Sequence, residues 1–146
     1  MSGYDLLARV MRDELSKNGF AELRTSDDVD AALTAPGTVL VAVNSNCGCA
    51  GGTMRPAVVE ALRRGPAPDR AVTVFASGDA EATARAREYF TGYAPSSPAI
   101  ALLRDGAVVF MLERHQIKPS TPEAVADQVA SALAEWAKPA AERQDV

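Results

Sequence analysis

The 146-residue sequence lacks several features that mark membrane, secreted and nucleic-acid-binding proteins. No apolar run approaches the roughly 18 residues that a membrane span requires, and charged residues interrupt residues 1–14, where a signal peptide would need an apolar core. Lys and Arg total 15 against 19 Asp and Glu, so no basic field is present to hold a nucleic acid. We therefore expect a soluble, cytoplasmic protein whose partners include neither nucleic acid nor a membrane.

Cysteine and histidine are also scarce, which limits metal binding. The chain has only Cys47, Cys49 and His115, whereas a structural zinc site takes four such ligands. A reducing cytosol disfavours stable disulfides, and a three-residue loop removes little unfolded-state entropy. Transient redox chemistry is therefore favoured over three alternatives, namely a metal site, two buried apolar thiols, and a phosphate cradle built on Gly48, Gly51 and Gly52.

The length and the hydrophobic content of 47% fit one domain over residues 1–146, with 138–146 as a frayed tail. Periodicity and turn residues predict helices near 4–15, 26–35, 49–64, 79–90 and from 122 onward. They predict strands near 20–24, 38–43, 72–75, 99–103 and 107–112.

Local signals refine these elements. Ser26, Asp79 and Thr121 are expected as helix N-caps, and Pro56 should kink the third helix. In the first helix, the inner face is expected to carry Tyr4, Leu7, Ala8, Met11 and Leu15.

The uninterrupted apolar run at 38–43 predicts a strand buried on both faces, and Asp105-Gly106 predicts a hairpin. The order of elements is that of an α/β, thioredoxin-like three-layer sandwich, a central mixed β-sheet flanked by helices. In such sheets, sites lie beyond the carboxyl ends of strands, where residues 44–52 fall.

Cys47-Gly48-Cys49 therefore lies between a buried strand and a helix. Gly48 permits the curl that two cysteines so close together need in order to bond. The N–H groups at a helix start favour a thiolate, so Cys47 is the candidate nucleophile and Cys49 the candidate resolving thiol. Their disulfide ring would be small and readily reduced.

The chain resembles the bacilliredoxins, and the likeness covers nearly its full length. It rests on five separated motifs: Val43–Ala50, Arg55-Pro56, Arg87–Gly92, Ala94–Pro98 and Arg114-His115.

The resemblance implies that Cys47 accepts bacillithiol from S-bacillithiolated client proteins, and that Cys49 or a second bacillithiol then resets Cys47. Bacillithiol, a low-molecular-weight thiol, would be a co-substrate, and no cofactor would be tightly bound. The likeness also implies that Ser97-Pro98 is a cis-proline turn facing the active site, and we expect Gly48, Ser97 and Pro98 to bind substrate.

The chain differs from the family pattern at two places, and the roles of two further residues stay open. Many relatives end the last helix with a cysteine, where this chain has residues 134–137 without one, and Asn46 stands where an apolar residue is common. Arg55 could attract an anionic thiol or be a solvated charge, and His115 could assist proton transfer or only pack. General protein disulfide reduction or isomerisation, and non-catalytic redox sensing, remain alternative functions.

Overall fold

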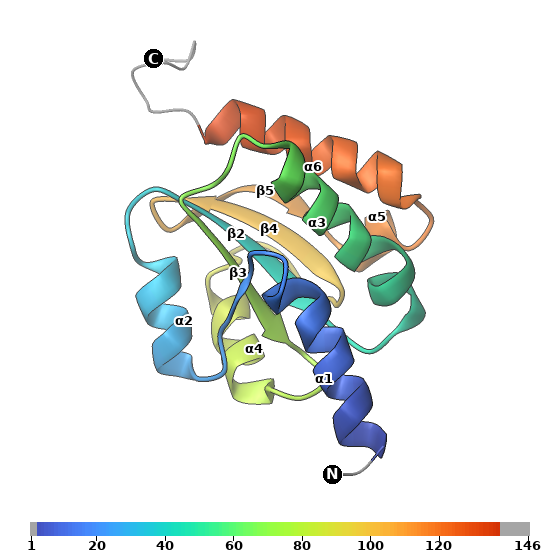
Figure 1. Cartoon of the computed structure of the whole chain (residues 1–146). Coiled ribbons are helices and arrows are strands. Elements are labelled where there is room, and N and C mark those ends of the chain that lie inside the picture. The colour runs from blue at the N-terminus through green and yellow to red at the C-terminus, as the bar shows by residue number, and fades with distance from the viewer. Residues whose placement is uncertain (1–2, 138–146) are drawn as a thin grey trace.

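A mixed five-stranded sheet forms the centre of the protein in the computed structural model, which describes residues 3–137 apart from the side chain of Tyr4 (Figure 1). The strands lie in the order β1-β3-β2-β4-β5; β1 and β2 run parallel to β3, and β4 runs antiparallel to β2 and β5. Their bounds are β1 Ala21–Glu22, β2 Thr38–Asn44, β3 Arg70–Phe75, β4 Ala99–Arg104 and β5 Ala107–Leu112. The expected tail at 138–146 lies outside the described residues.

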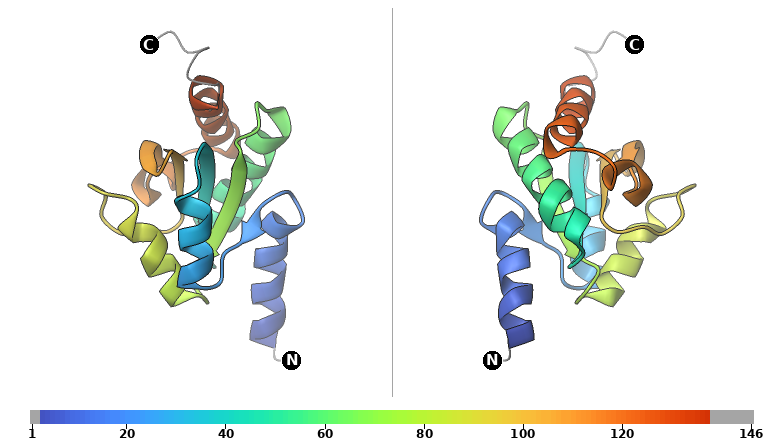
Figure 2. Two further views of the ribbon diagram at one scale, coloured as in Figure 1. Left: turned by 90° about the vertical axis from the view of Figure 1, so that its left-hand side faces the viewer. Right: turned by 90° about the vertical axis from the view of Figure 1, so that its right-hand side faces the viewer.

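Helices cover both faces of this sheet, which confirms the predicted three layers (Figures 1 and 2). The apolar side chains of α1, α3, α5 and α6 pack on one face, and those of α2 and α4 on the other. The helices are α1 Gly3–Ser16, α2 Ser26–Leu33, the π-helix η1 Ala50–Met54, α3 Arg55–Arg64, α4 Ala80–Glu88, α5 Arg114–Ile117 and α6 Pro122–Trp136.

Strand β2 is the buried centre of the sheet, as its unbroken apolar run predicts. All seven of its residues are buried. Successive side chains point to opposite faces, so Leu40 and Ala42 enter one core while Val39, Val41 and Val43 enter the other. This burial on both faces holds the carboxyl end of β2, where the cysteines follow, in a fixed place.

The hairpin between β4 and β5 is also confirmed. Asp105 and Gly106 have φ values of 50° and 85°. Positive φ at both central residues gives the turn a twist that matches the strands.

One expected N-cap is wrong, and a second, Asp79, lies at the N-cap of α4 as predicted but makes no capping bond with its side chain. Thr25, not Ser26, caps α2: its hydroxyl accepts from the N–H of Asp28, whose carboxylate in turn accepts from the N–H of Thr25. This reciprocal capping box takes the place of a bond from Ser26. Asp79 precedes α4, yet its carboxylate accepts from Arg12 and Arg24 instead of the helix.

The third helix is irregular before Pro56, not at it. Residues 50–54 form a π-helical turn, and the N–H of Arg55 reaches back five residues to Ala50 O. Pro56 then falls in the first turn of α3, where its missing N–H costs little. The cysteines therefore lead into a widened helical turn.

The short helix α5 was not predicted from the sequence, which indicated only the end of the hairpin at residues 114–117. Glu113 and Gln116 exchange side-chain and backbone hydrogen bonds across its first turn. Thr121 caps α6 as predicted, accepting from the N–H of Ala124.

Helix α1 extends beyond the sheet at its N-terminal end (Figure 2), and its expected inner face is partly wrong. Leu15 is buried, but Leu7 is 59% exposed. None of the described helices is long and apolar enough to cross a membrane.

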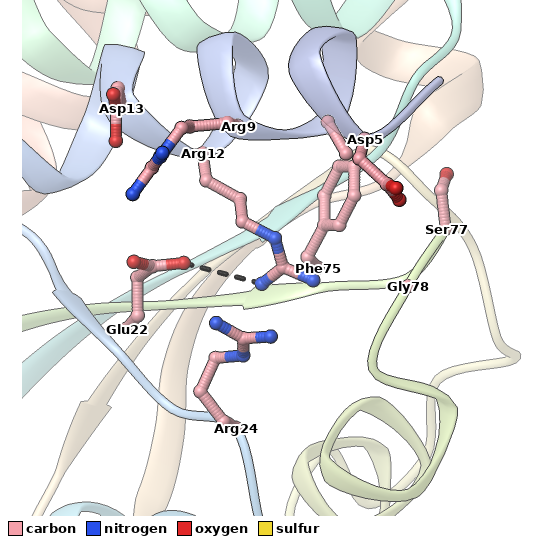
Figure 3. Close-up of a pocket in the computed structure, with 10 residues that line it drawn as sticks. Asp5, Arg9, Arg12, Asp13, Glu22, Arg24, Phe75, Ser77 and Gly78 are labelled. Atoms are coloured by element: carbon pink, nitrogen blue, oxygen red, sulfur yellow. Dashed lines mark hydrogen bonds and ion pairs between the residues drawn. The ribbon is translucent and has the colours of Figure 1, made fainter. Parts of the chain in front are cut away.

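An arginine anchors α1 to the sheet at the edge of a cavity of about 600 Å³ (Figure 3). Arg12 Nη1 donates to Glu22 at 3.2 Å and to Asp79 at 2.6 Å, and the guanidinium lies 4.6 Å from the Phe75 ring centre. Since the Arg12 guanidinium and both carboxylates are at most part-exposed, loss of this contact should loosen α1.

We expect Arg12→Met to lower the free energy of unfolding by about 1–3 kcal/mol, because partly buried carboxylates lose their donor. Arg9→Met is the matched control, since Arg9 lines the same cavity from the same helix and forms no ion pair within the described residues. Chemical denaturation of both variants measures the difference. Equal stability of the two would contradict the anchoring role.

Candidate active site

Three segments that are distant in sequence meet at one edge of the sheet. Val43 in β2 pairs with Ala99 in β4, so the residues after β2 lie opposite the turn that precedes β4. Ile100 pairs with Leu112 near the end of β5, so the start of α5 reaches the same edge. The site thus combines the cysteine turn, the turn at 96–98 and residues 113–115.

Cys47 and Cys49 form a close dithiol at this edge. Both are free and partly exposed, and their Sγ atoms lie 3.1 Å apart. A disulfide bond is about 2.05 Å long, so a small movement would join them. The two cysteines fall in the same range of exposure, so neither sulfur is closed off from a substrate.

The Cys47 thiol is set up to ionise. Burial raises its pKa, but the Ser45 hydroxyl, the Cys49 thiol and the N–H groups of Ala50 and Cys49 donate to the sulfur, and together they lower the pKa to about 7. Ser45 Oγ lies 3.2 Å from Cys47 Sγ and is itself buried. About half of the Cys47 side chains would therefore be thiolate at neutral pH.

The Cys49 thiol is shifted in the opposite direction. Its pKa is raised, first by burial and then by its contact with Cys47, and the positive charge of Arg114 only partly offsets this. Cys49 therefore holds its proton while Cys47 ionises. In such a pair, the Cys47 thiolate can attack while the protonated Cys49 donates a hydrogen bond to it.

The dithiol form does not test the role expected for Gly48, which is to permit the backbone curl of the disulfide form. Its φ is not positive, and a Cβ added to it would meet no atom within 4 Å. The dithiol form therefore does not use the conformational freedom of glycine. Gly48 is exposed and adds no side chain between the two cysteines in the sequence, so the surface beside them is uncrowded.

Arg55 is not a solvated charge, which corrects that expectation. It is 5% exposed. Its Nη1 donates to Asn44 Oδ1 and Ser45 O, both at 2.8 Å, and its Nε bonds Glu14. Asn44 also donates to Met11 O. Arg55 thus positions the cysteine turn from behind.

The turn before β4 has the expected form, since the Ser97–Pro98 peptide is cis. Two arginines bind its carbonyls: Arg87 Nη2 donates to Ser96 O at 3.3 Å and Arg114 Nη1 to Ser97 O at 3.0 Å. A carbonyl has two lone pairs, so Ser97 O retains capacity for a further donor. A second cis peptide, Gly65–Pro66, lies away from this edge.

His115 is exposed on α5, and no contact of its side chain with the cysteines is seen. Among residues 3–137, no group of three or more His, Cys, Asp or Glu side chains could hold a metal ion. The site therefore consists of a dithiol, hydroxyl and amide donors, and nearby arginines.

Comparison with known proteins agrees with this geometry. A family profile described as "Disulphide isomerase" matches residues 4–137. A bacilliredoxin of Geobacillus kaustophilus is 51% identical over 133 residues, covering 91% of this chain and 92% of the relative. The chain belongs to the bacilliredoxin family. A second bacilliredoxin, from Staphylococcus aureus, is 57% identical over 107 residues, covering 73% of this chain and 74% of its own length.

Solved structures show the same fold at low sequence identity. Mitochondrial thioredoxin 3 of Saccharomyces cerevisiae has a TM-score of 0.54 at 16% identity, covering 77% of this chain and 94% of its own. A thioredoxin of Fasciola hepatica has a TM-score of 0.55 at 17% identity, covering 78% and 99%. The thioredoxin-like prediction is confirmed, and this family member is a thiol-disulfide oxidoreductase.

Sequence reasoning missed two residues of this bacilliredoxin site. Ser45 could have been found from the sequence, because a hydroxyl two residues before a reactive thiol is a candidate hydrogen-bond donor to its sulfur. Arg114 stood in a motif of the family likeness but received no role, because its approach to the cysteines depends on the undetected helix α5.

We expect Ser45→Ala to raise the pKa of Cys47 from about 7 to about 8 or above, because a hydrogen bond to a charged group is worth about 1.5–3 kcal/mol. Alkylation of Cys47 in a Cys49→Ser background should rise with pH and reach half its maximum at this pKa. Ser45→Thr keeps a hydroxyl and should stay nearer 7. An unchanged midpoint in Ser45→Ala would show that the hydroxyl does not stabilise the thiolate.

Proposed function

We propose that the protein removes bacillithiol from S-bacillithiolated client proteins, with Cys47 as nucleophile and Cys49 as resolving thiol. The observation that carries the proposal is the difference in acidity between the two thiols: the pKa of Cys47 is lowered to about 7 and that of Cys49 is raised. Relatives named bacilliredoxins support the choice of adduct. The cytoplasm is the proposed compartment.

The reaction proceeds by two exchanges. The Cys47 thiolate attacks the bacillithiol sulfur of the mixed disulfide, an S–S bond to Cys47 forms, and the client leaves as a thiolate. Cys49, 3.1 Å away in the dithiol form, then gives up its proton and attacks the Cys47 sulfur. Bacillithiol leaves as a thiolate. In place of Cys49, a second bacillithiol can attack the bacillithiol sulfur of the adduct, which forms bacillithiol disulfide and releases Cys47 as a thiolate.

The surrounding surface suits a client that approaches with its modified cysteine. Cys47 and Cys49 are partly exposed and Gly48 is exposed, so no side chain lies between the two sulfurs. The cis turn at Ser97–Pro98 lies opposite the residues that follow β2. Its backbone can pair with an extended client segment, as an added strand does.

General protein disulfide exchange is the second candidate. The description of the matching family profile, "Disulphide isomerase", favours it. It predicts turnover of proteins that contain a Cys–Cys disulfide at rates similar to those for bacillithiolated clients. A side-by-side rate comparison at equal client concentration separates the two functions.

Adduct transfer tests the leading proposal directly. A bacillithiolated client is mixed with Cys49→Ser protein, and intact-mass analysis should find one bacillithiol on Cys47 and a free client thiol. Cys47→Ser should leave the client modified, and wild type should release bacillithiol as Cys47 and Cys49 bond. Transfer that persists in Cys47→Ser, or fails in every variant, would refute the assignment.

A further inference from the structure

The guanidinium of Arg114 stands at the active-site edge with one side unused. Its Nη1 donates to Ser97 O at 3.0 Å, and its backbone N–H donates to Ser96 Oγ at 3.3 Å. Within residues 3–137, no hydrogen bond engages its Nε or Nη2, and no Asp or Glu carboxylate lies within ion-pair distance. The Nε–Nη2 side of a guanidinium matches a carboxylate with two parallel hydrogen bonds.

Several other arginines are bound to carboxylates instead. Examples are Arg12 with Glu22 and Asp79, Arg64 with Glu60 and Asp127, and Arg85 with Asp30. Arg114 is exposed, yet its bond to Ser97 O restricts where its guanidinium points. The net charge of −4 already keeps the chain away from neutrality, so Arg114 is not needed for solubility.

The position of Arg114 relates it to the reacting sulfurs. The start of α5 and the turn at Ser97 lie at the edge of the sheet where Cys47 and Cys49 follow the end of β2. Arg114 is close enough that its positive charge acts to lower the pKa of Cys49, against the larger effects of burial and Cys47. A guanidinium with a free side therefore lies at the same edge as any ligand joined to Cys47.

We propose that Arg114 binds a carboxylate of the small thiol that Cys47 accepts, and so selects anionic low-molecular-weight thiols over neutral ones. This inference rests on the proposed function. Arg55, which the sequence offered for this role, is buried and already bonded to Glu14, Asn44 and Ser45.

The test uses two small disulfides in place of any natural substrate. One is the nitrobenzoate disulfide, which has a carboxylate on each ring, and the other is the neutral dithiodipyridine. In a Cys49→Ser background, the Cys47 thiolate attacks one sulfur of the probe, a mixed disulfide with Cys47 forms, and a coloured thiolate leaves. The ratio of the two rates cancels any change in the thiolate fraction of Cys47.

We expect Arg114→Gln to slow the reaction with the anionic probe about 3–5-fold more than that with the neutral probe, which is the range of an exposed ion pair. Arg63→Gln is the control, because it removes one exposed positive charge at the far end of α3 and should leave the ratio unchanged. Added salt should shrink the preference of the wild type, since exposed charges are screened.

Equal slowing with both probes would show that Arg114 only positions the thiol or the turn, and no change would show that it does not touch the ligand. Either result overturns the inference. The assay contains no bacillithiol and no client, so it is independent of the adduct-transfer experiment. A charge preference without bacillithiol transfer would leave the inference standing and refute the proposed function.

Discussion

The buried guanidinium of Arg55 ties together the segments that hold the cysteine turn. It lies at the start of α3, and its Nη1 binds Asn44 Oδ1 and Ser45 O at the end of β2, while its Nε binds Glu14 of α1. A buried charge is costly unless it is paired and fully hydrogen-bonded, so these groups must stay together in the folded state. The turn that follows β2 is therefore fixed before any chemistry begins, and Ser45 is held where its hydroxyl reaches the Cys47 sulfur.

That fixed turn explains why two thiols so close in sequence differ in acidity. Burial raises the pKa of both thiols. Cys47 also gains donors from Ser45 and from the amides at the helix start, which lower its pKa, whereas Cys49 has a neighbouring thiolate, which raises its pKa further. Lowering the pKa of a thiol raises its thiolate fraction but reduces its intrinsic nucleophilicity, and it also makes the sulfur a better leaving group. A Cys47 that both accepts and releases an adduct suits reversible exchange better than one-way attack.

The sequence predicted most of the fold because its strongest patterns are local and agree with one another. The apolar run of β2 and the Asp105-Gly106 turn each depend on a few adjacent residues, and both predictions were confirmed. The cysteine pair could be found from proximity and from its place after β2. The remaining details depend on contacts between distant segments: Asp79 binds Arg12 instead of its own helix, and Arg55 binds Glu14 of α1. No local pattern shows where such partners meet. The same holds for Arg114, whose approach to the site requires α5 and the register of β4 with β5.

Cys47, not Cys49, is the thiolate of the reduced protein near neutral pH. Brief alkylation of the reduced wild-type protein across a pH series, followed by peptide mass analysis, measures the two thiols separately. We expect Cys47 to be modified first, with half-maximal rate near pH 7, and Cys49 to follow only at clearly higher pH. Modification of Cys49 first, or of both thiols with the same pH dependence, would contradict it.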